Sequence, residues 1–132
     1  MTETGIPSPP RVLVVEDDEN IGQLLQFMLE RSGYAPVLLA NGRDAADFIA
    51  REAPPALALF DVMLPYRDGF ELVGLARAQP GWAEVPLLML SAKSQERDIV
   101  RALEAGANDY VLKPFQPQEL LARIKRLVRK GG

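Results

Sequence analysis

Four short apolar runs in this chain each end on a polar side chain, and this pattern constrains the fold more than any other feature. The runs and the residues that follow them are residues 12–15 before Glu16 and Asp17, 57–60 before Asp61, 86–90 before Ser91, and 110–112 before Lys113. Runs that are apolar at successive positions are typical of parallel strands covered on both faces. Since parallel strands end at the same edge of a sheet, we expect these polar groups to converge where such sheets bind ligands.

Amphipathic helices are predicted between the apolar runs. The clearest one has apolar residues at helical spacing, namely Ile21, Leu24, Leu25, Met28 and Leu29. We expect Asp18 to cap its start and Gly33 to follow its end. Asn41 or Asp44 is expected to cap a second helix. Further helices are expected over residues 70–78, around 99–103 up to Gly106, and from Pro117 to about 128.

The strand order follows from one proline. Residues 34–40 are expected to form a strand, but Pro36 lies inside it, and proline is confined to edge strands because it cannot donate to a ladder. Five strand–helix units with right-handed crossovers and an edge second strand predict an α/β fold. Specifically, we expect a flavodoxin-like (βα)5 three-layer sandwich with a parallel sheet of order 2-1-3-4-5. The binding crevice then falls between strands one and three, which end at Asp17 and Asp61.

Composition narrows the chemistry that is available. The 132 residues, 48% apolar and 25% charged, indicate one globular domain. We place it at residues 11–130, after a disordered leader at residues 1–10. A net charge of −3 disfavours direct binding of nucleic acid by this chain. The chain has neither cysteine nor histidine, which excludes cysteine nucleophiles, histidine acid–base catalysis and metal ligands of both types.

Membrane insertion and secretion are not indicated. No apolar stretch reaches the roughly 18–20 residues that span a bilayer. Residues 1–10 have neither the cationic start nor the apolar stretch of a signal peptide. Together with the lack of cysteine, these features fit a cytoplasmic protein.

The acidic residues predict a cation site. Glu16, Asp17 and Asp61, brought together, would repel one another unless they were protonated or bridged by a cation. With carboxylate oxygens as the available ligands, Mg²⁺ is the favoured ion and Mn²⁺ an acceptable substitute. The alternative is an acidic loop that only caps a helix, which is the role we assign to Asp18.

Three residues suit the handling of a phosphoryl group beside such a cation. Asp61 can accept a phosphoryl group as an aspartyl phosphate, Lys113 can neutralise its charge, and the Ser91 hydroxyl can donate to its oxygens. Each also has an ordinary structural alternative: a turn carboxylate, a solvated surface lysine and a turn cap. The peptide bond between Lys113 and Pro114 is a candidate for the cis form.

The segments that hold these residues resemble the receiver domains of two-component response regulators. The resemblance covers residues 11 to about 130 and rests on segments that occur in order: VLVVEDD, LFDVMLPYRDG, LMLSA and YVLKPF. It implies that Glu16 and Asp17 bind the metal and that Asp61 is the phosphoacceptor. It also implies that Ser91 and Lys113 bind the phosphoryl oxygens.

The resemblance also implies roles that the residue chemistry alone does not reach. The backbone carbonyl of Met63 would complete the metal site, and Tyr110 would be an aromatic switch that turns inward as Ser91 moves toward the phosphate. The phosphoryl donor would be a histidine kinase or a histidine phosphotransfer protein, since this chain has no histidine. The output would be a changed surface of the fourth helix, fifth strand and fifth helix, recognised by a downstream effector protein or effector domain.

Two further expectations rest on the resemblance. Met63 and Lys93 would flank the attacking water, and because methionine cannot orient water by a strong hydrogen bond, we expect self-dephosphorylation over minutes to hours. Phosphorylation would promote homodimerisation through charged residues of the output surface, for which the candidates are Arg101, Asp109, Glu119, Arg123 and Lys125. The alternative is a monomer whose basic residues in the fifth helix only complement the helix dipole. Both a stand-alone receiver and a receiver of a longer regulator fit the sequence.

Three other functions compete with this interpretation. A Mg²⁺-dependent phosphohydrolase with an aspartyl-phosphate intermediate usually needs a second aspartate two residues after the nucleophile, where this chain has Met63. A flavin-binding module needs a phosphate loop rich in serine, threonine or glycine after the first strand, where this chain has acids. A degenerate receiver that only binds partners would lack some of the five key residues, and all five are present.

Overall fold

In the computed structural model, residues 8 to 131 are described, and they form five strands that alternate with five helices. The elements in chain order are β1 (Arg11–Val15), α1 (Glu19–Arg31), β2 (Ala35–Leu39), α2 (Gly42–Arg51), β3 (Leu57–Asp61), α3 (Gly69–Ala78), β4 (Leu87–Ser91), α4 (Glu96–Ala105), β5 (Asp109–Leu112) and α5 (Pro117–Gly131). The strands pair in parallel in the order β2-β1-β3-β4-β5, which confirms the predicted flavodoxin-like fold. Most of the predicted leader, residues 1–7, lies outside the described residues.

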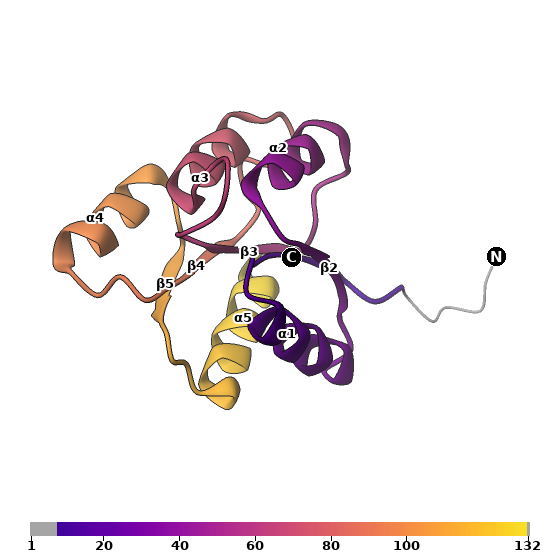
Figure 1. Ribbon diagram of the computed structural model, residues 1–132. Helices are drawn as coiled ribbons and strands as arrows, with labels where there is room; N and C mark the ends of the chain where they lie inside the picture. The colour runs from indigo at the N-terminus through magenta and orange to yellow at the C-terminus, as the bar shows by residue number, and fades with distance from the viewer. Residues whose placement is uncertain (1–7, 132) are drawn as a thin grey trace.

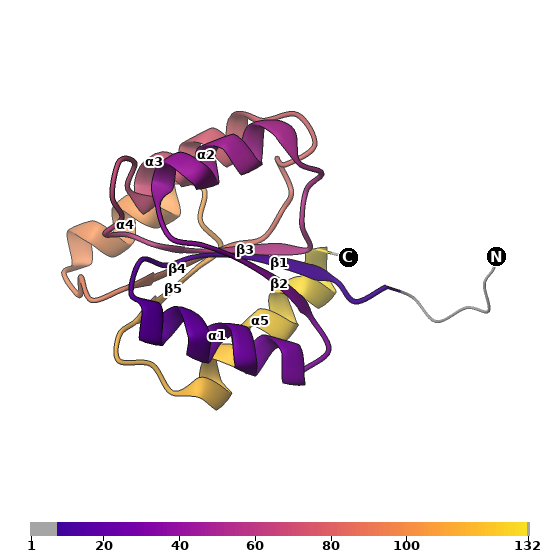
Figure 2. The same ribbon diagram turned by 45° about the vertical axis from the view of Figure 1, so that its right-hand side comes forward.

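The sheet lies between two layers of helices, with α1 and α5 on one face and α2, α3 and α4 on the other (Figure 1). Figure 2 shows the same three layers from the side. Successive residues of a strand face opposite layers. Leu13 and Phe60 therefore belong to the core beneath α2 and α3, while Val14 and Leu59 belong to the core beside α1 and α5. Burial on both faces explains why these strands are apolar at successive positions.

The second strand lies at an edge of the sheet, as its proline predicted. Pro36 is paired with Val12 of β1, and every residue of β2 is partly exposed. The Ala35 N–H donates to the carbonyl of Pro10, the last residue of the predicted leader, over 2.8 Å. This contact ties the chain just before β1 to the start of β2.

Helix boundaries follow the predicted caps. The Ile21 N–H donates to Asp18 Oδ1 over 3.1 Å, so Asp18 caps α1. The Asp44 N–H donates to Asn41 Oδ1 over 2.8 Å, which makes Asn41 rather than Asp44 the cap of α2. Gly106 ends α4 with a φ of 120°, a left-handed conformation that favours glycine.

The fourth helix forms where its periodicity predicted it, but little of it is buried. Ala102 is buried, whereas Val100 and Leu103 are 42% and 46% exposed. This helix therefore leaves apolar side chains at the surface beside β5. Neither α4 nor any other helix within residues 8–131 combines the length and apolar content that crossing a membrane requires.

Candidate functional site

The carboxyl ends of four strands bring the predicted polar residues to one edge of the sheet. Glu16 and Asp17 follow β1, Asp61 and Ser91 end β3 and β4, and Lys113 follows β5. One carboxylate oxygen from each of the three acids lies within 4.8 Å of the others. The acids meet because β1 and β3 are neighbours in the sheet, although they are separated in the chain by β2 and two helices.

A single ammonium group contacts two of these acids. Nζ of Lys113 lies 2.8 Å from Oε1 of Glu16 and 2.9 Å from Oδ2 of Asp61. The lysine side chain is 16% exposed, and the two acidic side chains are 0% and 6% exposed. Lys113 is therefore a largely buried member of the cluster and not a solvated surface lysine. The bond to Pro114 is cis, as expected.

Burial and neighbouring charges shift the pKa values of Glu16 and Lys113 in this cluster. Burial raises the pKa of Glu16, and Asp61 adds to the rise, while the Lys113 ammonium and the Asp18 N–H oppose it. Burial by itself would lower the pKa of Lys113, but its contacts with Glu16 and Asp61 outweigh burial and raise that pKa. The lysine is therefore held in its charged form, and the net effect of the surroundings is to disfavour ionisation of Glu16.

The cluster fits a small divalent cation. Oε2 of Glu16 accepts from the Asp18 N–H over 3.0 Å, whereas the buried Oε1 has no aligned hydrogen bond from any described residue. Asp17 is exposed, so its carboxylate is accessible. Three carboxylates beside one ammonium leave net negative charge, and carboxylate oxygens with water are the ligands that Mg²⁺ prefers. Because the Met63 N–H donates to Asp61 Oδ1 over 3.2 Å, Met63 also lies at this cluster.

A second set of contacts joins the site to β5. Ser91 is fully buried, and its Oγ accepts a hydrogen bond from the Lys93 N–H over 3.0 Å. This is the contact expected of a serine that caps a turn. The Tyr110 phenol donates to the Lys93 carbonyl over 2.9 Å. Burial raises the pKa of the Tyr110 phenol, against an opposing contribution from the Ser91 hydroxyl. The segment after β4 thus contacts both the hydroxyl at the site and the aromatic residue of β5.

The residues that shape the loop after Asp61 were not identified from the sequence. The Gly69 N–H donates to the Val62 carbonyl over 2.9 Å, so the loop closes on itself. A Cβ atom at Gly69 would lie 2.4 Å from the Asp61 carbonyl oxygen, which leaves room only for glycine. Within the loop, Tyr66 has a φ of 74°. The Asp-Gly pair before the expected helix at 70–78 was the one available signal of this tight return.

The five residues considered for a dimer face lie on α4, β5 and α5, and several have partners within the chain. Arg123 contacts Asp109 over 3.1 Å and Glu119 over 2.9 Å. The Arg101 guanidinium lies 4.1 Å from the centre of an aromatic ring of α3. Lys125 is exposed on α5. A dimer that used Arg123, Asp109 and Glu119 would therefore have to exchange contacts that already exist.

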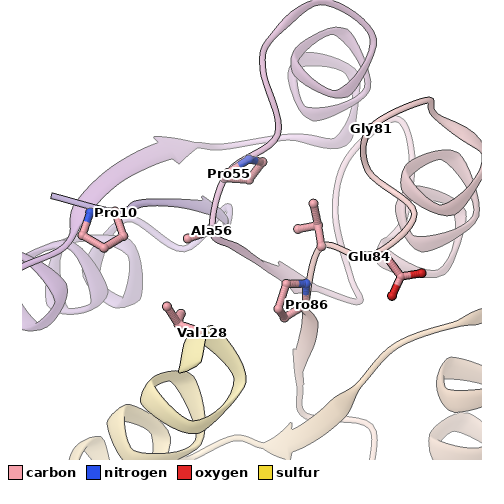
Figure 3. Close-up of a pocket in the computed structure, with 8 residues that line it drawn as sticks. Pro10, Pro55, Ala56, Gly81, Glu84, Pro86 and Val128 are labelled. Carbon is pink, nitrogen blue, oxygen red and sulfur yellow. The ribbon is translucent and has the colours of Figure 1, made fainter. Parts of the chain in front are cut away.

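A cavity of about 420 Å³ lies at the opposite edge of the sheet (Figure 3). Pro10, Ala56 and Pro86 line it and directly precede β1, β3 and β4, and Val128 of α5 lies beside them. The acidic cluster is at the carboxyl ends of β1 and β3. The cavity is therefore separate from the acidic site.

Comparison with curated proteins points to regulators of transcription. The chain is 40% identical over 131 residues to the transcriptional regulatory protein BaeR of Escherichia coli O6:H1, covering 98% of this chain and 53% of that protein. It is 45% identical over 121 residues to the alkaline phosphatase synthesis transcriptional regulatory protein PhoP of Bacillus subtilis, covering 92% of this chain and 49% of that protein. The chain thus spans about half the length of these relatives.

Solved structures and a family model identify the kind of domain that this chain forms. A CheY-like receiver domain protein from Methanospirillum hungatei superposes with a TM-score of 0.87 at 31% identity, covering 94% of this chain and 97% of that chain. The receiver domain of a sensor histidine kinase from Pseudomonas aeruginosa, solved with a magnesium ion in its active site cleft, superposes with a TM-score of 0.84 at 32% identity, covering 92% and 98%. Residues 12–125 match the model of the response regulator receiver domain, and the chain belongs to that family.

Proposed function

We propose that this chain is a phosphorylation-activated signalling switch in which Asp61 accepts a phosphoryl group with the help of Mg²⁺. The observation that carries the proposal is the Lys113 ammonium placed between the buried Glu16 and Asp61. A lone buried ion pair would need one carboxylate, whereas this site gathers three. Such a surplus of carboxylates suits a divalent cation, and the lysine suits the charge of an incoming phosphoryl group.

The residues at the site divide the work of transfer. A carboxylate oxygen of Asp61 attacks the phosphorus of a phosphohistidine, the P–N bond breaks, and the histidine nitrogen leaves with the bonding pair and takes up a proton from solvent. The Met63 N–H on Oδ1 and the Lys113 ammonium on Oδ2 hold the Asp61 carboxylate in a fixed orientation before the attack. After transfer, Lys113 and the Ser91 hydroxyl are placed to bind phosphoryl oxygens.

The proposed metal ligands are Glu16, Asp17, Asp61 and the backbone carbonyl of Met63. When bound, Mg²⁺ supplies the positive charge that lets a phosphoryl dianion approach three carboxylates. Mn²⁺ is expected to substitute, since it accepts the same oxygen ligands. The accessible Asp17 carboxylate and the incompletely satisfied Glu16 Oε1 support this assignment.

The proposed switch runs from Ser91 to Tyr110. Lys93 accepts the phenol hydrogen bond and donates to Ser91, so a shift of Ser91 toward a phosphoryl group would move the partner of Tyr110. The change would spread over α4, β5 and α5, where Val100 and Leu103 are exposed. A downstream effector protein or domain, or a second copy of the chain, would read that surface.

The partners follow from the same chemistry. The donor would be a histidine kinase or a histidine phosphotransfer protein, because the chain has no histidine to phosphorylate. The domain that acts as the switch would be residues 11–130. DNA binding belongs to this proposal only through an effector, since the chain itself carries a net charge of −3.

Incubation with Mg²⁺ and acetyl phosphate tests the phosphoacceptor. Intact-mass spectrometry should show one added phosphoryl group on the wild-type chain and none on Asp61→Asn. Chelation of the metal should abolish the addition on the wild type. Labelling of Asp61→Asn at the wild-type rate would refute the assignment, and steady turnover of a phosphomonoester would favour the phosphohydrolase alternative.

Met63 is proposed to make the phosphorylated state long-lived. Its side chain is 59% exposed beside the site and offers no strong hydrogen bond to an attacking water. Met63→Asn places a side-chain amide there and should shorten the lifetime of the phosphorylated protein, followed as loss of radiolabel after removal of the donor. Met63→Leu is the matched control and should keep the wild-type lifetime. An unchanged lifetime in Met63→Asn would contradict this role.

A further inference from the structure

We infer that Tyr66, in the loop between β3 and α3, is a positioning residue for the protein that donates the phosphoryl group. The inference rests on the proposed function, in which Asp61 is the acceptor. It is carried by the backbone conformation of Tyr66, by the exposed stack of its ring with Arg43, and by the way its loop is fixed next to Asp61.

The backbone of Tyr66 is in a conformation that its side chain disfavours. Its φ of 74° lies in the left-handed region, and among residues 8–131 it is the one residue other than glycine with a positive φ. For a bulky side chain this conformation is a genuine outlier, whereas glycine adopts it freely. Strain of this kind persists where surrounding contacts impose it, and it is concentrated at functional sites. Glycine would adopt this conformation without strain, so we assign the tyrosine side chain a function of its own.

Packing in the protein interior does not explain the tyrosine side chain at position 66. Tyr66 is 69% exposed, so most of its ring adds nothing to the core. The Arg43 guanidinium carbon lies 4.3 Å from the ring centre, which holds the ring by a cation–π contact while its other face remains accessible. An oriented, exposed aromatic ring beside an arginine has the composition of a protein-binding hot spot.

The loop that carries this ring is held at its middle and at its C-terminal end. The Pro65 carbonyl accepts from the N–H groups of Gly42 over 3.0 Å and Arg67 over 2.9 Å. A Cβ atom at Gly42 would lie 1.9 Å from the Arg67 carbonyl oxygen, so the first turn of α2 packs directly on the loop backbone. The loop ends at Gly69, whose N–H donates to the carbonyl of Val62, the residue after Asp61, over 2.9 Å. The ring is therefore carried by a hydrogen-bonded loop that begins at Asp61 and returns to the residue after it.

The chemistry of transfer decides which partner meets this surface. A phosphohistidine must bring its phosphorus into bonding contact with Asp61, so the protein surface around that histidine covers the loop next to the acceptor. The exposed Met63 and Tyr66 offer apolar contact, whereas Arg43 and Arg67 lie 4.0 Å and 3.8 Å from the carboxylates of Asp44 and Glu71, which offset their charge. The partner that fits is a histidine-phosphorylated protein with apolar side chains around its phosphohistidine. A small donor such as acetyl phosphate meets Asp61 without covering the loop.

The Tyr66→Gly variant tests the role of the ring independently of the backbone conformation at this position. The variant removes the side chain and relieves the left-handed strain, so its melting temperature should equal or exceed that of the wild type. Tyr66→Phe keeps the ring and is the matched control. The protein donor is found by testing the autophosphorylated histidine kinases encoded in the same genome and taking the one that phosphorylates the wild-type chain fastest. Acetyl phosphate with Mg²⁺ is the small donor.

We expect Tyr66→Gly to lower kcat/KM for transfer from the kinase by about tenfold, mainly through a higher KM. The rate with acetyl phosphate should stay at the wild-type value, and Tyr66→Phe should behave as the wild type with both donors. Wild-type transfer from the kinase to Tyr66→Gly would overturn the inference. An equal loss with both donors would also overturn it, because the ring would then act on Asp61 itself. A wild-type chain that accepts from neither donor would refute the proposed function instead.

Discussion

The ammonium nitrogen of Lys113 lies 2.9 Å from Oδ2 of Asp61, although the two residues are 52 positions apart in the chain. The same nitrogen lies 2.8 Å from Glu16 Oε1. One cation thus compensates two buried carboxylates, and it does so at the point where a divalent metal and a phosphoryl group would add further charge. The stability of the fold and the chemistry of the site are coupled through this lysine.

Replacing Lys113 by methionine tests that coupling. The variant leaves Glu16 and Asp61 buried without their cation, so the free energy of unfolding should fall by about 3 kcal/mol in the absence of metal. Mg²⁺ should recover part of this loss, because the carboxylates bind a cation more strongly once the neighbouring ammonium is gone. Urea unfolding with and without Mg²⁺ measures both effects. An equal loss in the free energy of unfolding with and without Mg²⁺ would show that Lys113 and a metal do not contact the same carboxylates.

Gly69→Ala should disturb the loop that returns to Asp61. Its Cβ atom would lie 2.4 Å from the Asp61 carbonyl oxygen and 2.9 Å from the Val62 Cα, so the backbone must move. We expect a loss of about 2 kcal/mol in the free energy of unfolding and weaker Mg²⁺ binding by calorimetry. Gly74→Ala is the control in the same helix, because nothing lies within 4 Å of its added Cβ. That variant should gain about 0.5–1 kcal/mol, and a Gly69→Ala protein as stable as the wild type would contradict the geometry.

Arg77 should be required for stability. Its five guanidinium N–H groups make six contacts of 2.8–3.2 Å, one N–H being shared, with the carbonyls of Trp82, Ala83, Val85 and Gly106 and with the side chain of Asn108. Arg77→Lys keeps the charge but loses the planar fork, so several carbonyls lose their donor. Chemical denaturation should show a loss of about 3 kcal/mol. The exposed Arg51→Lys is the matched exchange and should change stability by less than about 0.5 kcal/mol. Equal effects of the two exchanges would exclude this role.

The phenol of Tyr110 should ionise at a higher pH than that of an ordinary tyrosine. Burial raises the pKa of its phenol above the ordinary 10.0, despite the Ser91 hydroxyl, which acts in the opposite direction. Because the folded pKa exceeds the unfolded one, the corresponding stability is present below about pH 10 and is lost as pH rises through the folded pKa. Absorbance of tyrosinate against pH should lose a late-ionising group in Tyr110→Phe. Since burial also raises the pKa of Tyr34, the difference between the two curves gives the assignment. A difference centred at or below pH 10 would contradict the burial of Tyr110.

Some expectations from the sequence concerned local structure, and these agree with the fold. Pro36 predicted an edge strand because a missing N–H excludes the middle of a ladder, and β2 lies at the edge. Asp18 was expected to cap α1, and its carboxylate accepts from the Ile21 N–H. The exposure of α4 was not foreseen, since helical spacing shows that a face is apolar but not whether another layer covers it.

The sequence by itself determined the elements, their order in the sheet and the group of residues that meet at its carboxyl edge. It did so because burial on both faces requires apolar residues at successive strand positions, and parallel strands then end together. Only the tertiary structure decided that one ammonium lies between Glu16 and Asp61, that Arg77 joins three segments, and that Tyr66 takes a left-handed backbone beneath Arg43. Those features depend on distances between residues far apart in the chain and on loop shapes imposed by packing, and neither leaves a periodic signal in the sequence.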